Sequence, residues 1–156
     1  ALPISYVHRE GKEPGVWFFS LEASNSLACE IARHCFGLPY HESNMSVVET
    51  DGVRAYRSKR RSVGYETVVN AEIGGELDLP HAGSFEFFLV ERYLLYTLKR
   101  GRLMTGRVHH SPYRLRSVLS SQCTDELVRS HGLPWGKIES ALYSDGVDVN
   151  VYPVEA

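Results

Sequence analysis

The sequence predicts a mainly β protein with about three helices, antiparallel wherever its strands can be paired. The dipeptide Asp51-Gly52 lies between two alternating runs, 45–50 and 53–58, a pattern typical of a β-hairpin turn. Aromatic and β-branched residues dominate most other segments, while helical periodicity is confined to a few. The chain has 156 residues, of which 43% are hydrophobic, so we expect a single domain over residues 1–156.

In the first third of the chain, two strands precede a helix. Alternation predicts a strand over 4–8, and a run of aromatic and β-branched residues predicts a second strand over 16–22. Apolar residues at helical spacing predict a helix over 26–36 with a serine at its N-cap. Gly37 can take the left-handed conformation at its end, and Pro39 prevents its continuation.

The strongest predicted helix covers residues 84–99, "SFEFFLVERYLLYTLK". Ser84 is an N-cap candidate, and Lys99 suits the negative end of the helix dipole. The segment is apolar almost all round, so we expect it to be buried on most sides. The other expected elements are a strand over 65–73, a loop over 74–83, strands over 102–110, 113–120 and 140–155, and a short helix over 124–132.

Charge and hydropathy exclude several classes of partner. The formal net charge is −2 and the isoelectric point is near 6.4, which argues against a protein built to bind nucleic acid or an anionic membrane. The basic run 53–65 has few aromatics for base stacking and reads as a solvated strand end. No apolar run approaches the roughly 20 residues that span a bilayer, and no leader peptide is visible. We therefore expect a cytoplasmic protein.

The cysteines and the start of the chain carry two further expectations. Cys29, Cys35 and Cys123 show no metal-ligand spacing, and the first two point about 240° apart around one helix, so we expect free thiols, no metal and no cofactor. The chain begins without methionine in what reads as a strand, so we expect an upstream segment to be missing.

Six blocks of the sequence carry a resemblance to a known family. They are "PGVWFFSLEASNSLA", "FGLPYHESNM", "YRSKRR", "FLVERYLLYT", "GRVHHSPYRL" and "YSDGVDVNVYPV". In this order they resemble the YqjF-like uncharacterised bacterial family, which belongs with the acetoacetate decarboxylase-like superfamily. The resemblance implies an antiparallel, cone-shaped β-barrel with a few helices around it and a ligand pocket inside. It also implies that this chain lacks the N-terminal strands of the barrel.

The resemblance places Tyr40 and His41 where acetoacetate decarboxylases carry two consecutive lysines. The first of those lysines forms a Schiff base with the keto acid, and the second lowers its pKa by like-charge repulsion. In "GLPYH" neither position can form an imine, so Schiff-base chemistry is absent. Tyr40 can still donate a hydrogen bond, and His41 can act as general acid or base; each can equally play a structural role.

Other candidate ligand-binding residues follow from alternation along predicted strands. Glu22 shares a face with Phe18 and can either look into the pocket or cap the following turn. Arg57 is in phase with Val53, so its guanidinium faces the interior if Val53 does, where it would call for an anion. His109 and the next residue must point to opposite faces, so only one of them can look inward.

Three other charged residues favour structural roles. Glu91 and Arg92 lie within the predicted apolar helix, where an unpaired charge is costly, and we expect ion pairs there. Arg33 lies on the helix before the motif, and a structural salt bridge is its favoured role.

Two functions from different classes remain. The first is a module that binds a small anionic or carbonyl-bearing molecule without a covalent bond. The second is an enzyme of the lyase or isomerase type that uses His41 as general acid or base, with Tyr40 as hydrogen-bond donor. If protonated His41 holds the anion, affinity falls between about pH 6 and 8; if Arg57 holds it, affinity is flat there. We favour the module with His41, and the sequence leaves room for a homo-oligomer.

Overall fold

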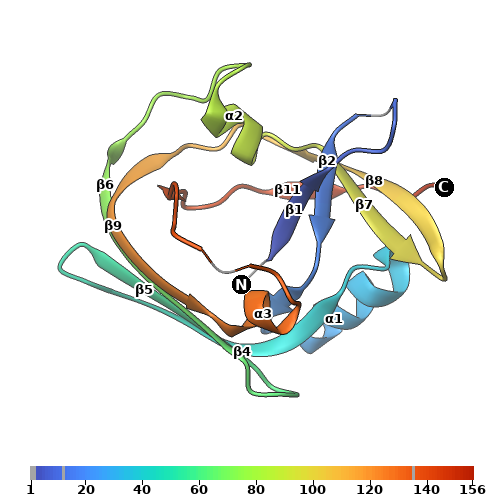
Figure 1. The fold of residues 1–156 in the computed structure, drawn as a ribbon, viewed down its shortest axis with the longest axis horizontal. Coiled ribbons are helices and arrows are strands. Elements are labelled where there is room, and N and C mark those ends of the chain that lie inside the picture. Colours follow the sequence, from blue (N-terminus) through green and yellow to red (C-terminus); the bar gives the residue numbers. More distant parts are fainter. Residues whose placement is uncertain (1–2, 12, 135) are drawn as a thin grey trace.

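The computed structural model describes residues 3–11, 13–134 and 136–156, and it shows a mainly β protein (Figure 1). Within these ranges the strands form two mixed sheets, and three short α-helices accompany them. The larger sheet curls into a half-barrel, with helix α3 (Glu126–Ser130) inside the curve and helix α1 (Ser26–Ile31) outside it (Figure 1). The mainly β prediction is confirmed.

The smaller sheet has five strands in the order β1-β2-β7-β8-β11. β2 pairs with β7 in parallel, Val16 opposite Leu95, while the other neighbours are antiparallel. The parallel pair corrects the expectation of a purely antiparallel protein. It is possible because β3 to β6 and α2 lie between the two strands in the sequence, so no tight turn forces the strands to run in opposite directions. The strand bounds are β1 Ile4–Val7, β2 Gly15–Phe18, β7 Leu94–Lys99, β8 Arg102–His110 and β11 Val149–Val151.

The larger, curled sheet has six strands in the order β10-β9-β6-β5-β4-β3. β3 and β4 are parallel because α1 connects them as a crossover, which is a second departure from the antiparallel prediction. The single strand expected over 16–22 is divided between the sheets: β2 ends at Phe18, and β3 begins at Leu21, where its N–H donates to the carbonyl of Pro39. The bounds are β3 Leu21–Ala23, β4 Tyr40–Thr50, β5 Val53–Arg60, β6 Glu66–Glu76, β9 Arg116–Asp125 and β10 Leu142–Tyr143.

The hairpin at Asp51-Gly52 is confirmed. β4 and β5 pair from Thr50 and Val53 to Ser43 and Arg60 without a break in register. Asp51 has φ 51° and Gly52 φ 78°, the two positive values that a tight turn matched to the twist of the strands requires. The turn therefore fixes which residues of the two strands face each other.

The first predicted helix is confirmed with a different cap. α1 continues into a π-helical segment, Ala32–Phe36, and together they cover the predicted 26–36. Asn25, and not a serine, is the N-cap: its side chain accepts from the N–H of Ala28 at 3.0 Å. Gly37 ends the helix with φ 68°, as predicted. The short third helix is also confirmed, as α3.

The long helix predicted over 84–99 is wrong. Helix α2 covers only Phe85–Val90, and the chain then enters β7. Four successive residues of β7 are buried, and a strand that is buried on both faces has the same all-round apolar pattern as a buried helix. The β-branched and aromatic content of "LLYT" is the signal that favours a strand.

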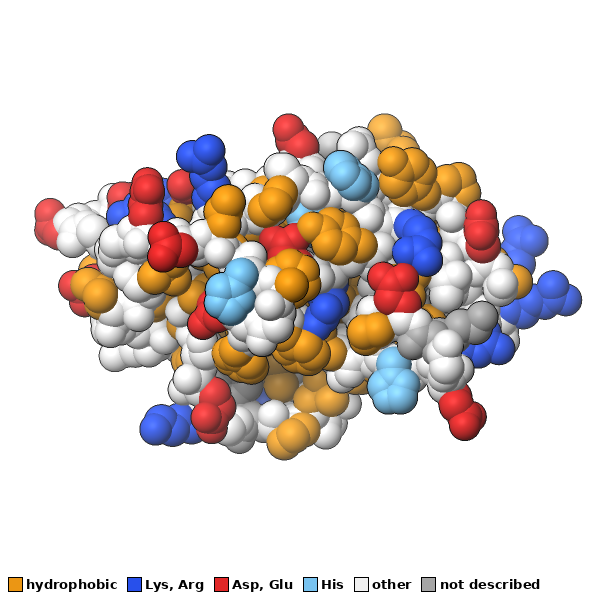
Figure 2. Space-filling view, turned by 90° about the horizontal axis from the view of Figure 1, so that it is seen from above, with side chains coloured by type: hydrophobic (Ala, Val, Ile, Leu, Met, Phe, Trp, Pro, Cys, Tyr) orange, Lys and Arg blue, Asp and Glu red, His pale blue; other side chains and the backbone are white. Residues whose placement is uncertain are grey.

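Helix α2 is also less buried than its composition suggests. Figure 2 shows hydrophobic side chains gathered in the middle of the face that carries α2, among acidic and histidine side chains. Phe85 and Phe88 of α2 are 56% and 43% exposed. In the part of the chain that the structure describes, no helix has the length and hydropathy to cross a bilayer.

The hydrophobic core joins the two sheets where β3 and β4 begin. Leu21, Leu38 and Leu95 form its buried centre. Partly buried residues pack around this centre: Phe18, Phe36, Tyr40 and Val108. The core thus fixes the point at which the chain passes from α1 into β4, just before His41.

Candidate functional site

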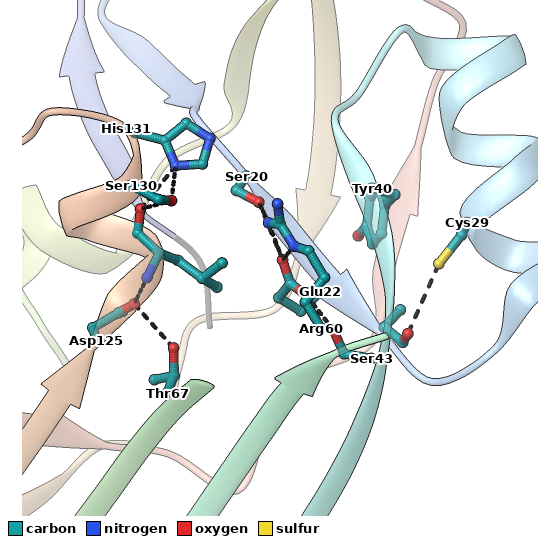
Figure 3. Close-up of polar contacts among 12 residues, drawn as sticks. Ser20, Glu22, Cys29, Tyr40, Ser43, Arg60, Thr67, Asp125, Ser130 and His131 are labelled. Atoms are coloured by element: carbon teal, nitrogen blue, oxygen red, sulfur yellow. Dashed lines mark hydrogen bonds and ion pairs between the residues drawn. The ribbon is translucent and has the colours of Figure 1, made fainter. Parts of the chain in front are cut away.

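A buried carboxylate on the curled sheet, Glu22 of β3, is the centre of the candidate site (Figure 3). Its side chain is fully buried and forms an ion pair with Arg60 of β5, with 2.5 Å between Nη2 and Oε1. Arg60 Nε and Ser20 Oγ both donate to the same oxygen at 3.1 Å. Ser43 Oγ donates to the other oxygen, and Arg60 also donates to Ser20 Oγ. Both oxygens of the carboxylate therefore accept hydrogen bonds, as a buried charge requires.

Strand register explains why these residues meet. Ser43 lies opposite Arg60 in the hairpin, because pairing counted outward from Asp51-Gly52 brings the two together. Glu22 lies opposite His41 in the parallel pair. Since residues two apart on a strand share a face, His41 and Ser43 lie on the same side as Glu22 and Arg60. Two strand pairings thus converge on one patch of the inner face.

His41 is half-buried at the edge of this cluster. Burial lowers the pKa of its imidazole, and the positive charges of Arg60, Arg33 and His131 lower it further, while Glu22 acts in the opposite direction. At neutral pH the ring is therefore uncharged, with one nitrogen as donor and the other as acceptor. The balance of charge around it is positive.

Helix α3 adds a second group of polar contacts beside the cluster (Figure 3). Asp125 caps the helix by accepting from the N–H of Leu127 at 2.9 Å, and the same oxygen accepts from Thr67 Oγ1 at 2.9 Å. His131 Nδ1 lies 2.8 Å from the carbonyl of Leu127. Because a carbonyl only accepts, this contact makes Nδ1 the protonated nitrogen and leaves Nε2 as the acceptor or second donor.

Tyr40, the neighbour of His41, lies on the opposite face of β4. Figure 3 shows it on the side of Cys29 and α1, away from Glu22 and Arg60. It packs on the hydrophobic core, and burial raises the pKa of its phenol. Arg33 donates from Nη1 to the carbonyl of Tyr40 at 2.9 Å, in place of the expected salt bridge. The structure thus separates Tyr40 and His41, because the motif "YH" begins a strand and does not form a loop.

Arg57 lies outside the site. Its side chain is 63% exposed, and its Nε lies 3.7 Å from Glu66. The condition for its inward orientation fails because Val53 is 41% exposed. The residues of β5 that alternate with Arg57 face inward instead, and Ser58 and Arg60 among them are buried. The register of the Asp51-Gly52 hairpin, extended to residues 43 and 60, is the signal from which Arg60 and Ser43 could have been found.

His109 lies on the smaller sheet, away from His41, and lines a separate cavity of about 670 Å³. As alternation predicted, His109 and His110 point to opposite faces, the first exposed and the second 6% exposed. His110 is stacked on the ring of Tyr93, with ring centres 4.7 Å apart, and Tyr113 meets it edge-on.

Glu91 is a second buried carboxylate, 4% exposed, and its partners differ from those expected. It accepts from the hydroxyl of Tyr93 and from the backbone N–H of Tyr113, the latter at 3.2 Å. Arg92 instead lies over the ring of Phe88, 4.3 Å from its centre. The expected ion pairs are therefore wrong: α2 ends at Val90, and Glu91 and Arg92 beyond it have different partners.

The described lysines do not approach the candidate site. Lys59 is exposed on the outward phase of β5, Lys137 is exposed, and Lys99 Nζ donates to the carbonyl of Cys35 at 2.6 Å. Lys12 lies outside the described residues. Among residues 3–11, 13–134 and 136–156, no group of three or more His, Cys, Asp or Glu could hold a metal ion. In the same ranges the three cysteines are free, as predicted.

Fold and site together define a mainly β, half-barrel protein with a buried carboxylate–guanidinium pair on the inner face of its curled sheet. The chain belongs to the family DUF2071, described as "Uncharacterized conserved protein (COG2071)", whose model matches residues 5–148. It is 31% identical over 158 residues to the "Uncharacterized protein YqjF" of Bacillus subtilis (strain 168), a match that covers 96% of this chain. The chain spans 62% of the length of that relative. No solved structure matches it.

Proposed function

We propose that this chain is a small-molecule-binding module with an acetoacetate decarboxylase-like pocket that lacks the Schiff-base lysines. The observation that carries the proposal is the uncharged His41, half-buried beside the Glu22–Arg60 pair, with no described lysine near it. The curled sheet, with polar side chains on its inner face, supports a barrel of the cone-shaped type. Its ligand is a small organic acid or carbonyl compound, held without a covalent bond.

The charge around His41 favours an anionic ligand. Arg60 and Arg33 outweigh Glu22 in their effect on the pKa of this imidazole, so a carboxylate bound beside it enters a positive field. The bound carboxylate would in turn raise the pKa of His41, since an opposite charge favours the protonated ring. Binding and protonation therefore favour each other, and affinity should rise as the pH falls below about 6.5. The change in affinity therefore lies at lower pH than the range of about pH 6 to 8 that the sequence predicts.

Binding of acetoacetate and acetate, followed by the histidine resonances of the protein, tests the proposal. We expect saturable shifts of the His41 ring and of the backbone amides beside it on β4, both stronger toward acidic pH, and the amide shifts should disappear in His41→Gln. Arg57→Gln is the matched control, because that exposed arginine lies outside the site and should leave binding unchanged. Shifts that are flat between pH 5.5 and pH 8, or that survive His41→Gln, would contradict the site; the pH limits bracket the ordinary histidine pKa of about 6.5.

Borohydride reduction separates non-covalent binding from imine chemistry. We expect no adduct after reduction in the presence of acetoacetate, because the described lysines are exposed or bonded elsewhere. Intact-mass measurement is the readout, with a true acetoacetate decarboxylase as positive control. An adduct on any of the four lysines would refute the non-covalent proposal.

An enzyme that uses His41 as general acid or base is the second candidate. The lowered pKa of the imidazole favours it, because the ring is uncharged at neutral pH and can accept a proton. Glu22 does not serve as a second acid, since all its contacts are committed to Arg60 and the two serines. Turnover of a bound acid that is lost in His41→Gln would establish the enzyme, whereas binding without turnover supports the module.

A further inference from the structure

We infer that the cavity lined by His109 is a second ligand site, suited to a small carboxylic acid with an apolar body. Its volume of about 670 Å³ lies within the range of about 300–1,000 Å³ that is usual for small-molecule sites. None of the residues that line it belongs to the Glu22–Arg60 cluster or is His41. The inference therefore stands apart from the proposed function.

The floor of the cavity is a buried, paired part of the smaller sheet. Leu94 and Tyr96 of β7 are 6% and 3% exposed, and they pair with Arg107 and Thr105 of β8. Paired residues on neighbouring antiparallel strands share a face, so these four side chains form one surface. His109 continues this surface along β8, because it lies two residues beyond Arg107.

Two other segments form the walls and are tied to the floor by hydrogen bonds. Glu13, in the connection between β1 and β2, accepts at its carbonyl from the hydroxyl of Tyr96 at 2.7 Å. On the other side, Thr105 and Glu155 exchange backbone hydrogen bonds of 2.7 and 2.8 Å, and the N–H of Tyr152 donates to the carbonyl of Arg107 at 3.0 Å. The cavity is thus pre-formed, which lowers the entropic cost of binding.

The nitrogen donors of the cavity can hold a carboxylate. Arg9, Arg107 and His109 line it together with two glutamates, Glu13 and Glu155. Glu13 engages Arg107 through one nitrogen only, Nη1, at 3.1 Å. A planar guanidinium has further donors that match the two oxygens of a carboxylate. The apolar floor of Leu94 and Tyr96 and the ring of Tyr152 suit an aromatic or aliphatic body. Benzoate is the simplest molecule that combines both features.

Binding of benzoate, followed by chemical shifts of the protein, tests the second site. We expect saturable shifts at His109 and its neighbours on β8, and benzamide, which has the same shape without the charge, should bind far more weakly. Arg107→Gln should weaken benzoate binding by at least about tenfold, the effect of losing one charge-assisted contact. Arg57→Gln is a close match as a control, because both arginines pair with a glutamate and their side chains are 66% and 63% exposed.

The outcomes also separate this site from the one at His41. If His41→Gln leaves the benzoate shifts at His109 unchanged while Arg107→Gln removes them, the second site is independent, whatever happens to acetoacetate binding. Equal binding of benzamide and benzoate would overturn the assignment of an anion. No saturable shift at His109, or binding that Arg107→Gln leaves intact, would overturn the site itself.

Discussion

Glu22 and Glu91 are both buried carboxylates, but the protein compensates them in different ways. Glu22 is paired with a guanidinium that comes from a distant strand, and two serine hydroxyls complete its contacts. Glu91 accepts from a phenol two residues away and from one backbone amide. The first pair is neutral overall, whereas the second is a negative charge held by neutral donors.

The difference shows in the groups around each carboxylate. At Glu91, the hydrogen bond from Tyr93, followed by burial and by the negative charge itself, raises the pKa of the Tyr93 phenol to about 12. At Glu22, the neighbouring imidazole of His41 is influenced more by the guanidinium than by the carboxylate. The cations around His41 thus act on it more than Glu22 does, which suits a site for anions, whereas Glu91 presents a negative charge to its neighbours.

Removal of Arg60 should have the largest effect on stability. Arg60→Met leaves Glu22 as a buried charge without its cation, which should lower the free energy of unfolding by about 3–5 kcal/mol. Urea denaturation measures the change. Arg61→Met is the control on the next residue, because its ion pair with Glu42 is partly exposed and worth about 0–1 kcal/mol.

A double substitution sharpens this result. Replacing both charges, in Glu22→Leu with Arg60→Met, should recover most of the loss, since an apolar pair of similar volume is often as stable as a buried ion pair. If the double variant were as unstable as Arg60→Met alone, the loss would reflect packing of the arginine side chain and not the charge of Glu22.

Tyr93→Phe should have a smaller effect, about 1–3 kcal/mol, because it removes a neutral donor from a buried carboxylate. The phenol also predicts a dependence on pH. Its folded pKa of about 12 exceeds the unfolded value of 10.0, so its contribution to stability is complete below pH 10 and is lost as the pH rises toward 12. Urea denaturation on either side of pH 10 should show this loss in the wild type and not in Tyr93→Phe; Tyr65→Phe, at an exposed ring, is the control.

His41 should give the smallest effect, in the opposite pH direction. Its folded pKa lies below the unfolded value of 6.5, so its neutral form favours the folded state, and stability is complete above pH 6.5 and falls as the pH decreases through the folded pKa. His41→Gln should flatten this part of the stability curve, measured by thermal unfolding across mildly acidic pH. An unchanged curve would show that His41 is not held beside Arg60 in solution.

The sequence predicts the local parts of this site better than the long-range ones. The Asp51-Gly52 hairpin was identified, and its register already implies that Ser43 faces Arg60. The approach of Glu22 could not be predicted in the same way, because it depends on a parallel pairing across a helix, which no turn residue marks. The resemblance gives Tyr40 and His41 the two neighbouring lysine positions and so assigns both to one pocket, whereas alternation along β4 places their side chains on opposite faces.

The misread helix has a similar cause. The segment 84–99 contains both the end of α2 and a strand that is buried on both faces, and apolar periodicity does not separate the two over so short a length. The break itself lies at Glu91, where the N–H of Arg92 donates to the carbonyl of Val90. The two charged residues Glu91 and Arg92 inside an apolar segment are the feature of the sequence that marks this break.

The parallel pairing of β2 with β7 bears on how the chain reaches its structure. β4, β5 and β6 pair through short connections and can form early, whereas Val16 must find Leu95 across most of the half-barrel. Gly15 sits at that junction, where a Cβ would lie 2.7 Å from the carbonyl oxygen of Leu94. We therefore expect the smaller sheet to close after the hairpins of the curled sheet have formed, at a junction that has no room for a side chain at position 15.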